Sequence, residues 1–334
     1  MIYLDGINYS IQRAGGISIY FDSLIEEIDK RGLPRHLLVH RSGLPFADIE
    51  ARTPRCMERY RDIPVTEAAS VFMSSYYRMQ TKPRNTPSVV TVHDFVYEAM
   101  MTGPKVTVHK WQKHRAIQNA TDIICISEAT RQDLFNYVGV PKGRIHVIHN
   151  GVSEAFFPRT AAHSHDGYIL FVGKRHGYKN FSLLVKAMEQ LPELDLICVG
   201  GEPWSEKEKT AVEATIKGKL IIKQGVSTEE LVGLFDRATA LVYPSLYEGF
   251  GIPIIEAMRS GCPAISIDCT AVREAGGTAL LVAESNRAGE IAELVRSTMG
   301  SDRSAIVEKG QEHAKMFSWA KTHDKTISVL SQHL

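Results

Sequence analysis

The sequence predicts an α/β protein with two domains, each built on a parallel sheet that helices cover on both faces. Short runs rich in apolar and β-branched residues alternate with stretches of helical periodicity along most of the chain, which is typical of that architecture. The chain has 334 residues, of which 44% are hydrophobic, so it is long enough to bury two cores. The alternation restarts near the middle of the chain with the fully apolar run 168–172, and this restart predicts the second domain.

Six strands are predicted in the first half, each a short apolar run between turn signals. They lie at residues 1–4, 35–40, 71–74, 88–93, 122–127 and 145–148. Helices are predicted between them at residues 18–31, 106–120 and 128–138. Ser127 precedes the last helix and is expected to cap it, because a serine hydroxyl can accept a hydrogen bond from a free amide of the first turn.

The second half repeats this organisation. Its strands are predicted at residues 168–172, 194–199, 220–223, 240–243, 264–267 and 279–282. Between the two series, the stretch 153–167 contains Pro158 and several small residues without periodicity, so it is the expected linker. We therefore expect one domain to end at residue 157 and the next to begin at residue 158.

Composition and charge exclude several classes of protein. The 39 Lys and Arg residues are balanced by 38 Asp and Glu residues, and a net charge of +1 is too small to hold a nucleic-acid backbone, so no nucleic-acid partner is expected. No apolar run approaches the roughly 20 residues that span a bilayer, and the chain begins with a predicted strand rather than a signal peptide, which predicts a cytoplasmic protein. The 5 cysteines lack Cys-x-x-Cys spacing, so neither a disulfide nor a zinc site is expected.

The turn after the first strand offers a place for an anion. It lacks the Gly-x-Gly-x-x-Gly pattern of dinucleotide-binding folds, but Gly15 and Gly16 open a helix. Because glycine has no Cβ, main-chain amides at this helix start can approach an anion closely, and the helix dipole favours negative charge. An ordinary turn is the alternative interpretation.

Two more loops carry charged side chains just after predicted strands. The strand 88–93 ends at His93, beside Asp94, at the carboxyl end of the sheet where such folds bind ligands; a histidine that caps the strand is the alternative. In the second half, Lys174, Arg175 and Lys179 lie in a glycine-bounded loop. This cluster suits a diphosphate, because arginine forks onto phosphate oxygens and lysine acts as a point charge.

The most specific pattern is the run 243–258, Tyr-Pro-Ser-Leu-Tyr-Glu-Gly-Phe-Gly-Ile-Pro-Ile-Ile-Glu-Ala-Met. A strand end is followed by a glycine-rich turn and a helix with Pro253 in its first turn, so free amides are expected to point at a ligand. Glu248 lies in the turn and Glu256 in the first helical turns, so two carboxylates flank this helix start. A favourable interaction with the helix dipole is the alternative for Glu256, whereas neither the turn nor a cap needs Glu248.

These motifs resemble those of the retaining glycosyltransferases of family 4 over nearly the whole chain. Glu248 and Glu256 fit that family's E-x7-E motif after a Tyr-Pro-Ser strand end. Further matching segments are Gly15-Gly16, 92–94, 126–133, 149–152, 172–180 and Phe317-Ser318-Trp319. The family often has Gly-Arg after the first strand of its second domain, whereas here Lys174 precedes Arg175, so either residue could meet the phosphate.

The resemblance implies the GT-B architecture, in which two Rossmann-like domains face a central cleft and the last helix crosses back to the first domain. It implies an acceptor-side domain at 1–157, joined by the helix 317–334, and a nucleotide-sugar-binding domain at 158–316.

The resemblance also implies roles for individual residues. Glu256 would bind the ribose, and Glu248 a hydroxyl of the donor sugar, while His93 would contact that sugar near the reacting carbon. The groups expected to hold the diphosphate are Lys174 or Arg175, Lys179, the glycines Gly15 and Gly16, and the amides of Phe250 and Gly251. The nucleotide base would lie near Val226.

By this resemblance the protein is a metal-independent hexosyltransferase that retains the anomeric configuration. The donor is a nucleotide diphosphate sugar. GDP-mannose is favoured because Gly-Tyr-Lys-Asn-Phe at 177–181 is similar to enzymes that build O-antigen and capsule with mannose or rhamnose donors, and a rhamnose donor is the alternative. The acceptor is a glycan or lipid-linked glycan. The chain has no Asp-x-Asp and no obvious covalent nucleophile, so neither a metal nor another cofactor is expected.

Two other functions stay open at this point, a GT-B nucleotide-sugar epimerase and a non-catalytic nucleotide-sugar-binding module. The segment 105–115, with Trp111, Lys110, Lys113, His109 and His114, could rest on anionic lipid at the cytoplasmic face of the inner membrane. A solvated helix face is the alternative interpretation of that segment.

Overall fold

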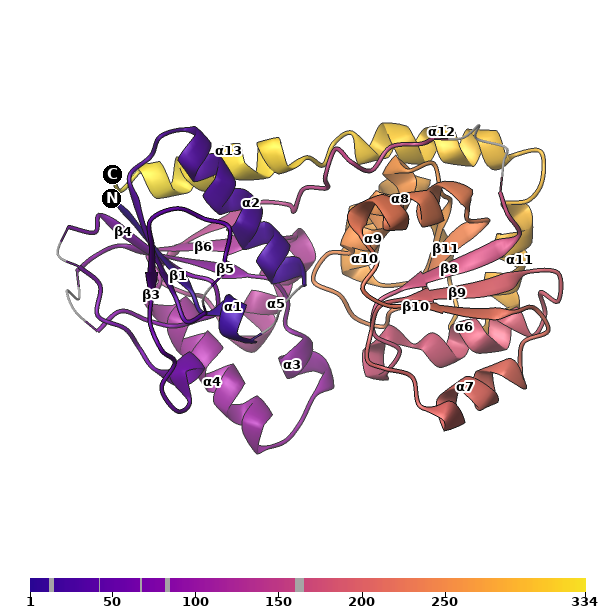
Figure 1. Ribbon diagram of the computed structural model, residues 1–334, viewed down its shortest axis with the longest axis horizontal. Coiled ribbons are helices and arrows are strands. Elements are labelled where there is room, and N and C mark those ends of the chain that lie inside the picture. Colours follow the sequence, from indigo (N-terminus) through magenta and orange to yellow (C-terminus); the bar gives the residue numbers. More distant parts are fainter. Residues whose placement is uncertain (12–14, 42, 67, 82–84, 160–164) are drawn as a thin grey trace. The chain divides into compact units, whose positions relative to one another are not determined.

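The computed structural model describes residues 1–11, 15–41, 43–66, 68–81, 85–159 and 165–334 (Figure 1). The chain divides into two compact units. The first comprises Met1–Asn150 together with Trp319–Leu334, and the second comprises Gly151–Ser318. Each unit contains one parallel sheet with helices packed against it, which confirms the predicted α/β class with two Rossmann-like halves.

Over its described residues, the sheet of the first unit has seven parallel strands in the order β3-β2-β1-β4-β5-β6-β7. The strands are β1 (Ile2–Gly6), β2 (Arg35–Val39), β3 (Ile49–Ala51), β4 (Val71–Ser74), β5 (Ser88–Val92), β6 (Asp122–Cys125) and β7 (Arg144–Val147). The six predicted strands are confirmed to within a few residues. The sequence prediction missed β3, because this edge strand is only 3 residues long and half-buried, and so shows little apolar pattern.

Helices of the first unit pack their apolar faces on this sheet. They are α1 (Asn8–Ile11), α2 (Gly16–Lys30), α3 (Val96–Met100), α4 (Pro104–Asn119), α5 (Glu128–Tyr137), α13 (Trp319–Ser331) and the 3-10 turn η1 (Glu58–Tyr60). The predicted cap of α5 is confirmed, since the Ser127 hydroxyl accepts a hydrogen bond from the Thr130 amide at 2.9 Å. Leu24 and Ile28 of α2 and Leu330 of α13 share one core with β1 and β2.

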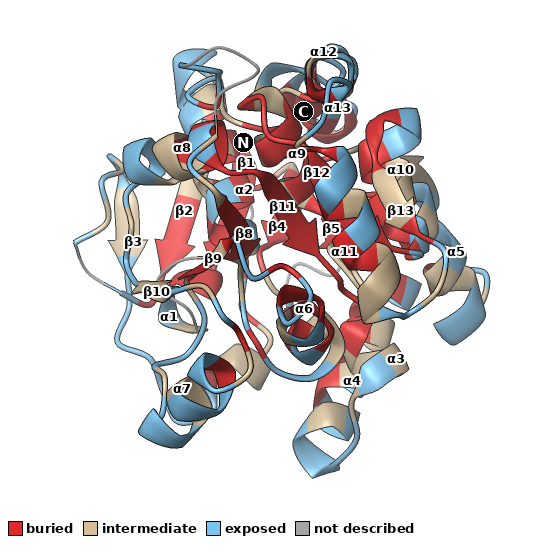
Figure 2. Ribbon diagram, turned by 90° about the vertical axis from the view of Figure 1, so that its right-hand side faces the viewer, coloured by how far each residue is buried: buried red, intermediate tan, exposed pale blue. Residues whose placement is uncertain are grey.

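The described part of the second unit contains a six-stranded sheet in the order β10-β9-β8-β11-β12-β13, again with every pair parallel. The strands are β8 (Tyr168–Val172), β9 (Asp195–Val199), β10 (Leu220–Lys223), β11 (Ala240–Tyr243), β12 (Ala264–Ile267) and β13 (Leu281–Ala283). All six predicted strands are confirmed, four of them to the residue. Figure 2 shows the central strands of both sheets buried, with exposed residues on the outer faces of the helices.

Helices cover this second sheet as well. They are α6 (Phe181–Met188), α7 (Glu206–Glu213), α8 (Thr228–Arg237), α9 (Ile252–Arg259), α10 (Thr270–Gly276), α11 (Ala288–Ser297), α12 (Arg303–Ala314) and the 3-10 turns η2 (Gly177–Lys179) and η3 (Gly277–Ala279). Of the helices that the structure describes, none is both long and apolar enough to cross a membrane.

The strand order reverses once in each sheet, between β1 and β4 in the first unit and between β8 and β11 in the second. In doubly wound folds, ligands bind outside the carboxyl ends of the strands at such a switch point. The loops that follow β8 and β11 are therefore the expected ligand site of the second unit.

The boundary between the units lies earlier than the sequence indicated, after Asn150 rather than after residue 157. The reason is that the segment after Asn150 packs on the second unit. The Phe156 ring lies 6.0 Å from that of Phe235, and the Phe156 carbonyl accepts a hydrogen bond from Arg259 at 3.1 Å. Residues 160–164 of the predicted linker lie outside the described residues.

Candidate functional site

Three polar side chains meet at the switch point of the second sheet, and we call them the switch-point triad: Lys179, Tyr243 and Glu248. Lys179 ends η2 in the loop after β8, Tyr243 is the last residue of β11, and Glu248 lies in the loop after β11. The Lys179 ammonium donates to the Tyr243 hydroxyl at 2.8 Å and to Oε1 of Glu248 at 2.5 Å. The lysine and glutamate side chains are only 13% and 12% exposed, so this ion pair is largely shielded from water.

The third side of the switch-point triad is a hydrogen bond between Tyr243 and Glu248. Burial raises the pKa of the Tyr243 phenol well above its usual value, and the charge of Glu248 and the hydrogen bond to it raise that pKa further. The phenol is therefore protonated at neutral pH and donates to the carboxylate. The triad thus combines one cation, one anion and one neutral donor in a closed arrangement.

Arg175 lies in the same loop but not in the triad. Its side chain is 1% exposed, and its guanidinium donates to Oε1 of Glu208 at 2.8 Å and to the Glu202 carbonyl at 2.7 Å. The guanidinium also lies 4.1 Å from the ring centroid of Trp204. Because these donors are engaged by protein groups, Arg175 supports the shape of the loop, and its contact with a phosphate stays a prediction.

Lys174 lies in the opposite environment. Its side chain is 68% exposed, and its ammonium is 3.7 Å from Oε1 of Glu202, a pair that is open to solvent. An exposed ion pair of this kind contributes little to stability, so the ammonium can exchange partners easily. Of the two alternatives that the sequence left open, Lys174 therefore has the more accessible side chain.

The start of α9 lies directly after the loop that holds Glu248. Gly251 is the residue before the helix and has φ near 120°, a conformation that only glycine adopts without strain. The predicted proline at the helix start is confirmed. Proline has no amide hydrogen, and the Ile254 amide donates to the Gly251 carbonyl at 2.9 Å, so the amides at the helix start are those of Gly251 and Ile252. The side chain of Phe250 does not face outward, since its ring is buried 5.5 Å from that of Phe317.

Glu256 is half-buried on α9. Burial raises its pKa to about 7, and burial is the only cause, because no charged group among the described residues offsets it. The carboxyl therefore takes up a proton much closer to neutral pH than an exposed glutamate does. A carboxyl without a nearby cation is well suited to a neutral partner such as a pair of sugar hydroxyls.

Val226 lies further along the same edge of the sheet. It precedes α8, where the Ser227 hydroxyl caps the helix by accepting from the Glu230 amide at 3.1 Å. The structure does not bring Val226 into the switch-point triad, because it follows β10, the strand at the outer edge of the sheet.

In the first unit, His93 and the glycine pair lie after β5 and β1. Among the described residues, a Cβ built on Gly16 would meet no atom within 4 Å. Desolvation lowers the pKa of His93 to about 4; Asp94 opposes that shift and Lys113 adds to it. The imidazole is therefore neutral at neutral pH, and its ring lies edge-on to Tyr20 at 5.4 Å.

Helix α4 differs from the surface helix that its sequence suggested. Lys113 is buried, donating to Glu98 at 3.0 Å and lying 3.7 Å from the ring centroid of Phe95, and His109 is buried as well. Trp111 is 58% exposed. The segment 105–115 therefore cannot present all its cations to a lipid surface, because two of the residues offered for that contact face the protein interior.

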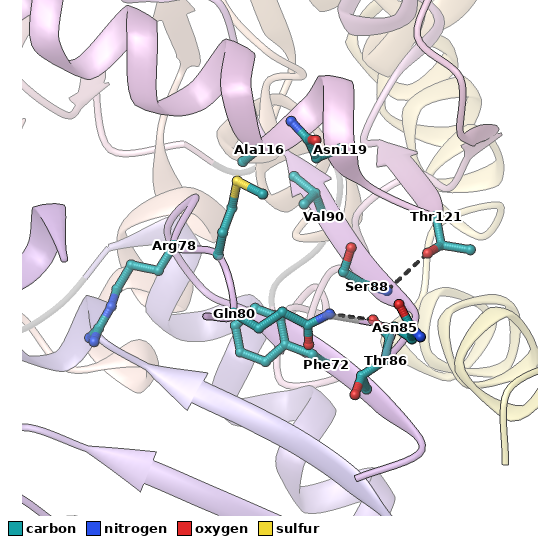
Figure 3. Close-up of a pocket in the computed structure, with 11 residues that line it drawn as sticks. Phe72, Arg78, Gln80, Asn85, Thr86, Ser88, Val90, Ala116, Asn119 and Thr121 are labelled. Carbon is teal, nitrogen blue, oxygen red and sulfur yellow. Dashed lines mark hydrogen bonds between the residues drawn. The ribbon is translucent and has the colours of Figure 1, made fainter. Parts of the chain in front are cut away.

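A cavity of about 320 Å³ lies elsewhere in the first unit (Figure 3). Phe72 and Ser88 line it from the beginnings of β4 and β5, and Ala116 and Asn119 line it from α4. The Arg78 guanidinium points away from it, as Figure 3 shows. This cavity adjoins the amino ends of the strands, so it is separate from the carboxyl-end loops. Within the described residues, no cluster of three or more His, Cys, Asp and Glu side chains is arranged to hold a metal ion.

Sequence reasoning had missed Tyr243 as a functional residue. From the sequence, Tyr243 is predicted only as the end of a strand. No local pattern shows that its hydroxyl contacts Lys179, which lies 64 residues earlier in the chain.

Comparison with known proteins finds matches to two glycosyltransferase families along the chain. Residues 152–313 match the family described as Glycosyl transferases group 1, and residues 68–156 match Glycosyltransferase Family 4.

Several characterised proteins are similar to this chain. O-antigen chain mannosyltransferase B of Escherichia coli is 29% identical over 264 residues, which is 72% of this chain and 69% of that protein. O-antigen chain mannosyltransferase RfbU of Salmonella typhimurium is 28% identical over 200 residues, 58% of this chain and 56% of that protein. D-inositol 3-phosphate glycosyltransferase of Mycolicibacterium smegmatis is 26% identical over 237 residues, and the match spans only 55% of its length.

Solved structures share the fold over nearly the whole chain. Sucrose-phosphate synthase from Thermosynechococcus elongatus superposes with a TM-score of 0.79 at 17% identity, covering 99% of this chain and 98% of that one. WaaG, a glycosyltransferase involved in lipopolysaccharide biosynthesis, gives 0.74 at 14% identity, covering 98% and 99%. Since two glycosyltransferase families match stretches that together span residues 68–313 of a chain with this two-domain fold, the protein is a glycosyltransferase with the GT-B fold, similar to those of family 4.

Proposed function

We propose that the protein transfers a hexose from a nucleotide diphosphate sugar to a hydroxyl of a glycan or lipid-linked glycan, with retention of the anomeric configuration. The observation that carries this proposal is the switch-point triad beside the start of α9. It puts a cation, a carboxylate and helix amides at the place where this fold binds ligands. The cation and the helix amides suit a diphosphate, and the carboxylate suits a sugar hydroxyl.

The charge that develops on the leaving diphosphate would be stabilised by Lys179 and Lys174 and by amides at Gly251, with the amide of Gly16 as a further donor. Helix N-termini favour anions, because amides without partners and the helix dipole act together. Placing cationic side chains and amides at the diphosphate supplies the stabilisation that a divalent ion gives in other enzymes. The proposed transfer is therefore metal-independent.

Three further residues would hold the rest of the donor. Glu256 accepts hydrogen bonds from the ribose hydroxyls, for which an ionised carboxylate is best suited. Since its pKa is about 7 in the free protein, bound ribose hydroxyls favour loss of that proton. Glu248 accepts from a hydroxyl of the transferred sugar. His93, neutral at physiological pH, contacts the same sugar near the reacting carbon.

Retention would proceed without a covalent intermediate. The carboxylate of Glu248 is held by Lys179 and Tyr243, and an anion stabilised in this way is a weak nucleophile. The acceptor hydroxyl would attack from the side that the diphosphate leaves, while a phosphate oxygen of the leaving group takes the hydroxyl proton. The bond from the anomeric carbon to the donor phosphate breaks as the bond to the acceptor oxygen forms.

GDP-mannose is the favoured donor, and surface-polysaccharide synthesis the favoured context. The support is that two relatives are O-antigen chain mannosyltransferases. The solved HepE structure from Anabaena contains UDP and glucose, but at 14% identity it supports only the fold. We place the protein at the cytoplasmic face of the inner membrane, where a lipid-linked acceptor would be presented.

Thermal-shift and transfer measurements test this function. GDP-mannose should raise the melting temperature more than UDP-, ADP- or dTDP-sugars, because a ligand that binds only the folded state stabilises it by mass action. Lys179→Ala should weaken binding of GDP roughly 10- to 150-fold, the worth of a charge-assisted hydrogen bond. The exposed Lys217→Ala, in the same unit, serves as the control.

Mannose transfer to a lipid-linked glycan should persist in excess EDTA. Activity that EDTA abolishes and magnesium restores would overturn the metal-independent mechanism. Sugar release without an acceptor product, or interconversion of the donor into an epimer, would overturn the transferase assignment.

A further inference from the structure

We propose that Glu248 makes the site discriminate the intact donor from the nucleoside diphosphate that remains after transfer. This inference rests on the proposed function and concerns how the same site releases its product. In the free protein Glu248 holds Lys179, so any diphosphate that binds that ammonium must share it with Glu248. Only a ligand that carries a sugar hydroxyl can give Glu248 a new donor in exchange.

The geometry supplies the basis for this competition. An ammonium group has three N–H donors and no acceptor. In the switch-point triad, one donor is directed to the Tyr243 hydroxyl at 2.8 Å and another to Glu248 at 2.5 Å, which leaves one for a ligand. Both charged side chains are nearly nine-tenths buried, so their attraction is screened much less than that of a surface pair.

A diphosphate that binds this ammonium brings negative charge close to Glu248. Two like charges in a poorly solvated site repel each other, and a carboxylate that loses part of its ion pair is left with unmet hydrogen-bonding capacity. For a bare nucleoside diphosphate, nothing compensates for these costs. For the intact donor, a sugar hydroxyl donates to Glu248 and restores its hydrogen bonding.

Tyr243 is the positioning residue of this arrangement. Its hydroxyl accepts from Lys179 and is hydrogen-bonded to Glu248, so it fixes both groups relative to each other. Its own place is fixed by the strand, because its carbonyl accepts from the Ser266 hydroxyl of the neighbouring β12 at 2.7 Å. The ring is 3% exposed, so it is packed inside the protein.

The test is to measure the affinities of GDP and GDP-mannose, and of UDP and UDP-glucose, for the wild-type protein and for Glu248→Gln. The amide keeps the shape of the side chain but removes the charge, so the free diphosphate should bind about tenfold tighter than to the wild type. The sugar nucleotide should gain less or lose affinity, because an amide is a weaker acceptor for the sugar hydroxyl. The ratio of donor to product affinity should therefore fall.

Two further variants keep the test specific. Glu284→Gln removes the same charge from an exposed pair with Arg273 in the same unit, and it should leave both affinities unchanged. Tyr243→Phe keeps both charges but loses the shared hydroxyl, so it should lower the ratio by a smaller factor. Melting temperatures of all variants check that they are folded.

The outcomes separate this inference from the proposed function. If the wild type binds none of the four nucleotides, the proposed function fails. If the wild type binds them, but Glu248→Gln leaves diphosphate affinity unchanged or lowers it, the site binds donors as proposed and the discrimination by Glu248 is wrong.

Discussion

At the scale of single residues, the contrast between Lys174 and Arg175 decides how the cationic loop is interpreted. These neighbours in sequence have side chains with 68% and 1% exposure. Arg175 ties together the segments after β8 and β9 through Gly200, Glu202 and Glu208. One cation of the loop thus supports its shape, and the other is available to a ligand.

Two alanine variants separate these roles. Arg175→Ala should lower the free energy of unfolding by about 3 kcal/mol, because it removes a buried cation and leaves Glu208 and two carbonyls without their donor. Lys174→Ala should leave the melting temperature nearly unchanged and weaken binding of nucleoside diphosphate. Thermal unfolding and calorimetry measure the two effects. A stable Arg175→Ala protein that had lost only diphosphate affinity would restore Arg175 as the phosphate ligand.

At the scale of elements, α13 shows how a segment late in sequence becomes part of the first unit. Ile327 and Leu330 join the core beneath α2, and the Thr322 hydroxyl donates to the His149 carbonyl at 2.8 Å. Beyond the helix, Nε2 of His333 lies 2.7 Å from Oδ2 of the buried Asp122. Apolar burial and these polar contacts therefore hold α13 on the rest of the first unit, so the first unit is incomplete without this helix.

Leu330→Ala tests that conclusion without deleting the helix. Leu330 is fully buried, and truncating such a leucine costs about 2–5 kcal/mol through lost burial and the cavity left behind. The exposed Lys325→Ala on the same helix is the matched control and should have little effect. Chemical denaturation measures both. A chain ending at Lys315 should lose solubility, and a truncated protein with full activity would contradict this account of the first unit.

At the scale of the whole molecule, the proposed mechanism divides the work between the two units. The groups assigned to the diphosphate and the ribose lie mostly in the second unit, whereas His93 lies in the first. A hydrogen bond to the reacting sugar strengthens as charge develops in the transition state. A hydrogen bond to the ribose has the same strength in the ground state and in the transition state. Binding and turnover should therefore respond to different residues.

His93→Ala and Glu256→Ala should show opposite effects. The histidine variant should lower kcat by about 100-fold or more while nucleoside diphosphate affinity stays close to the wild-type value. The glutamate variant should weaken nucleotide binding and retain most of its turnover at saturating donor. Initial-rate kinetics and calorimetry on the same preparations give both quantities. Loss of nucleotide affinity with unchanged turnover in His93→Ala would make His93 a binding or structural residue.

Local patterns in the sequence were sufficient for most elements and for the motif that names the family. Strands such as 71–74 and 168–172 were predicted to the residue, because a strand buried on both faces leaves a continuous apolar run. The short edge strand β3 has no such run and was missed. The spacing of Glu248 and Glu256 was likewise visible, since a loop and the helix after it are one continuous stretch of chain.

Only the tertiary structure decided which charged side chains meet. Lys179, Tyr243 and Glu248 form one cluster because β8 and β11 lie side by side in the sheet. In sequence, Lys179 is 64 residues from Tyr243 and 69 residues from Glu248. Arg175 turned inward because Glu208 and Trp204 offered it partners after β9. The sequence determines that a loop carries cations, but the partners that folding brings near determine whether each cation is buried in a network or remains available to a ligand.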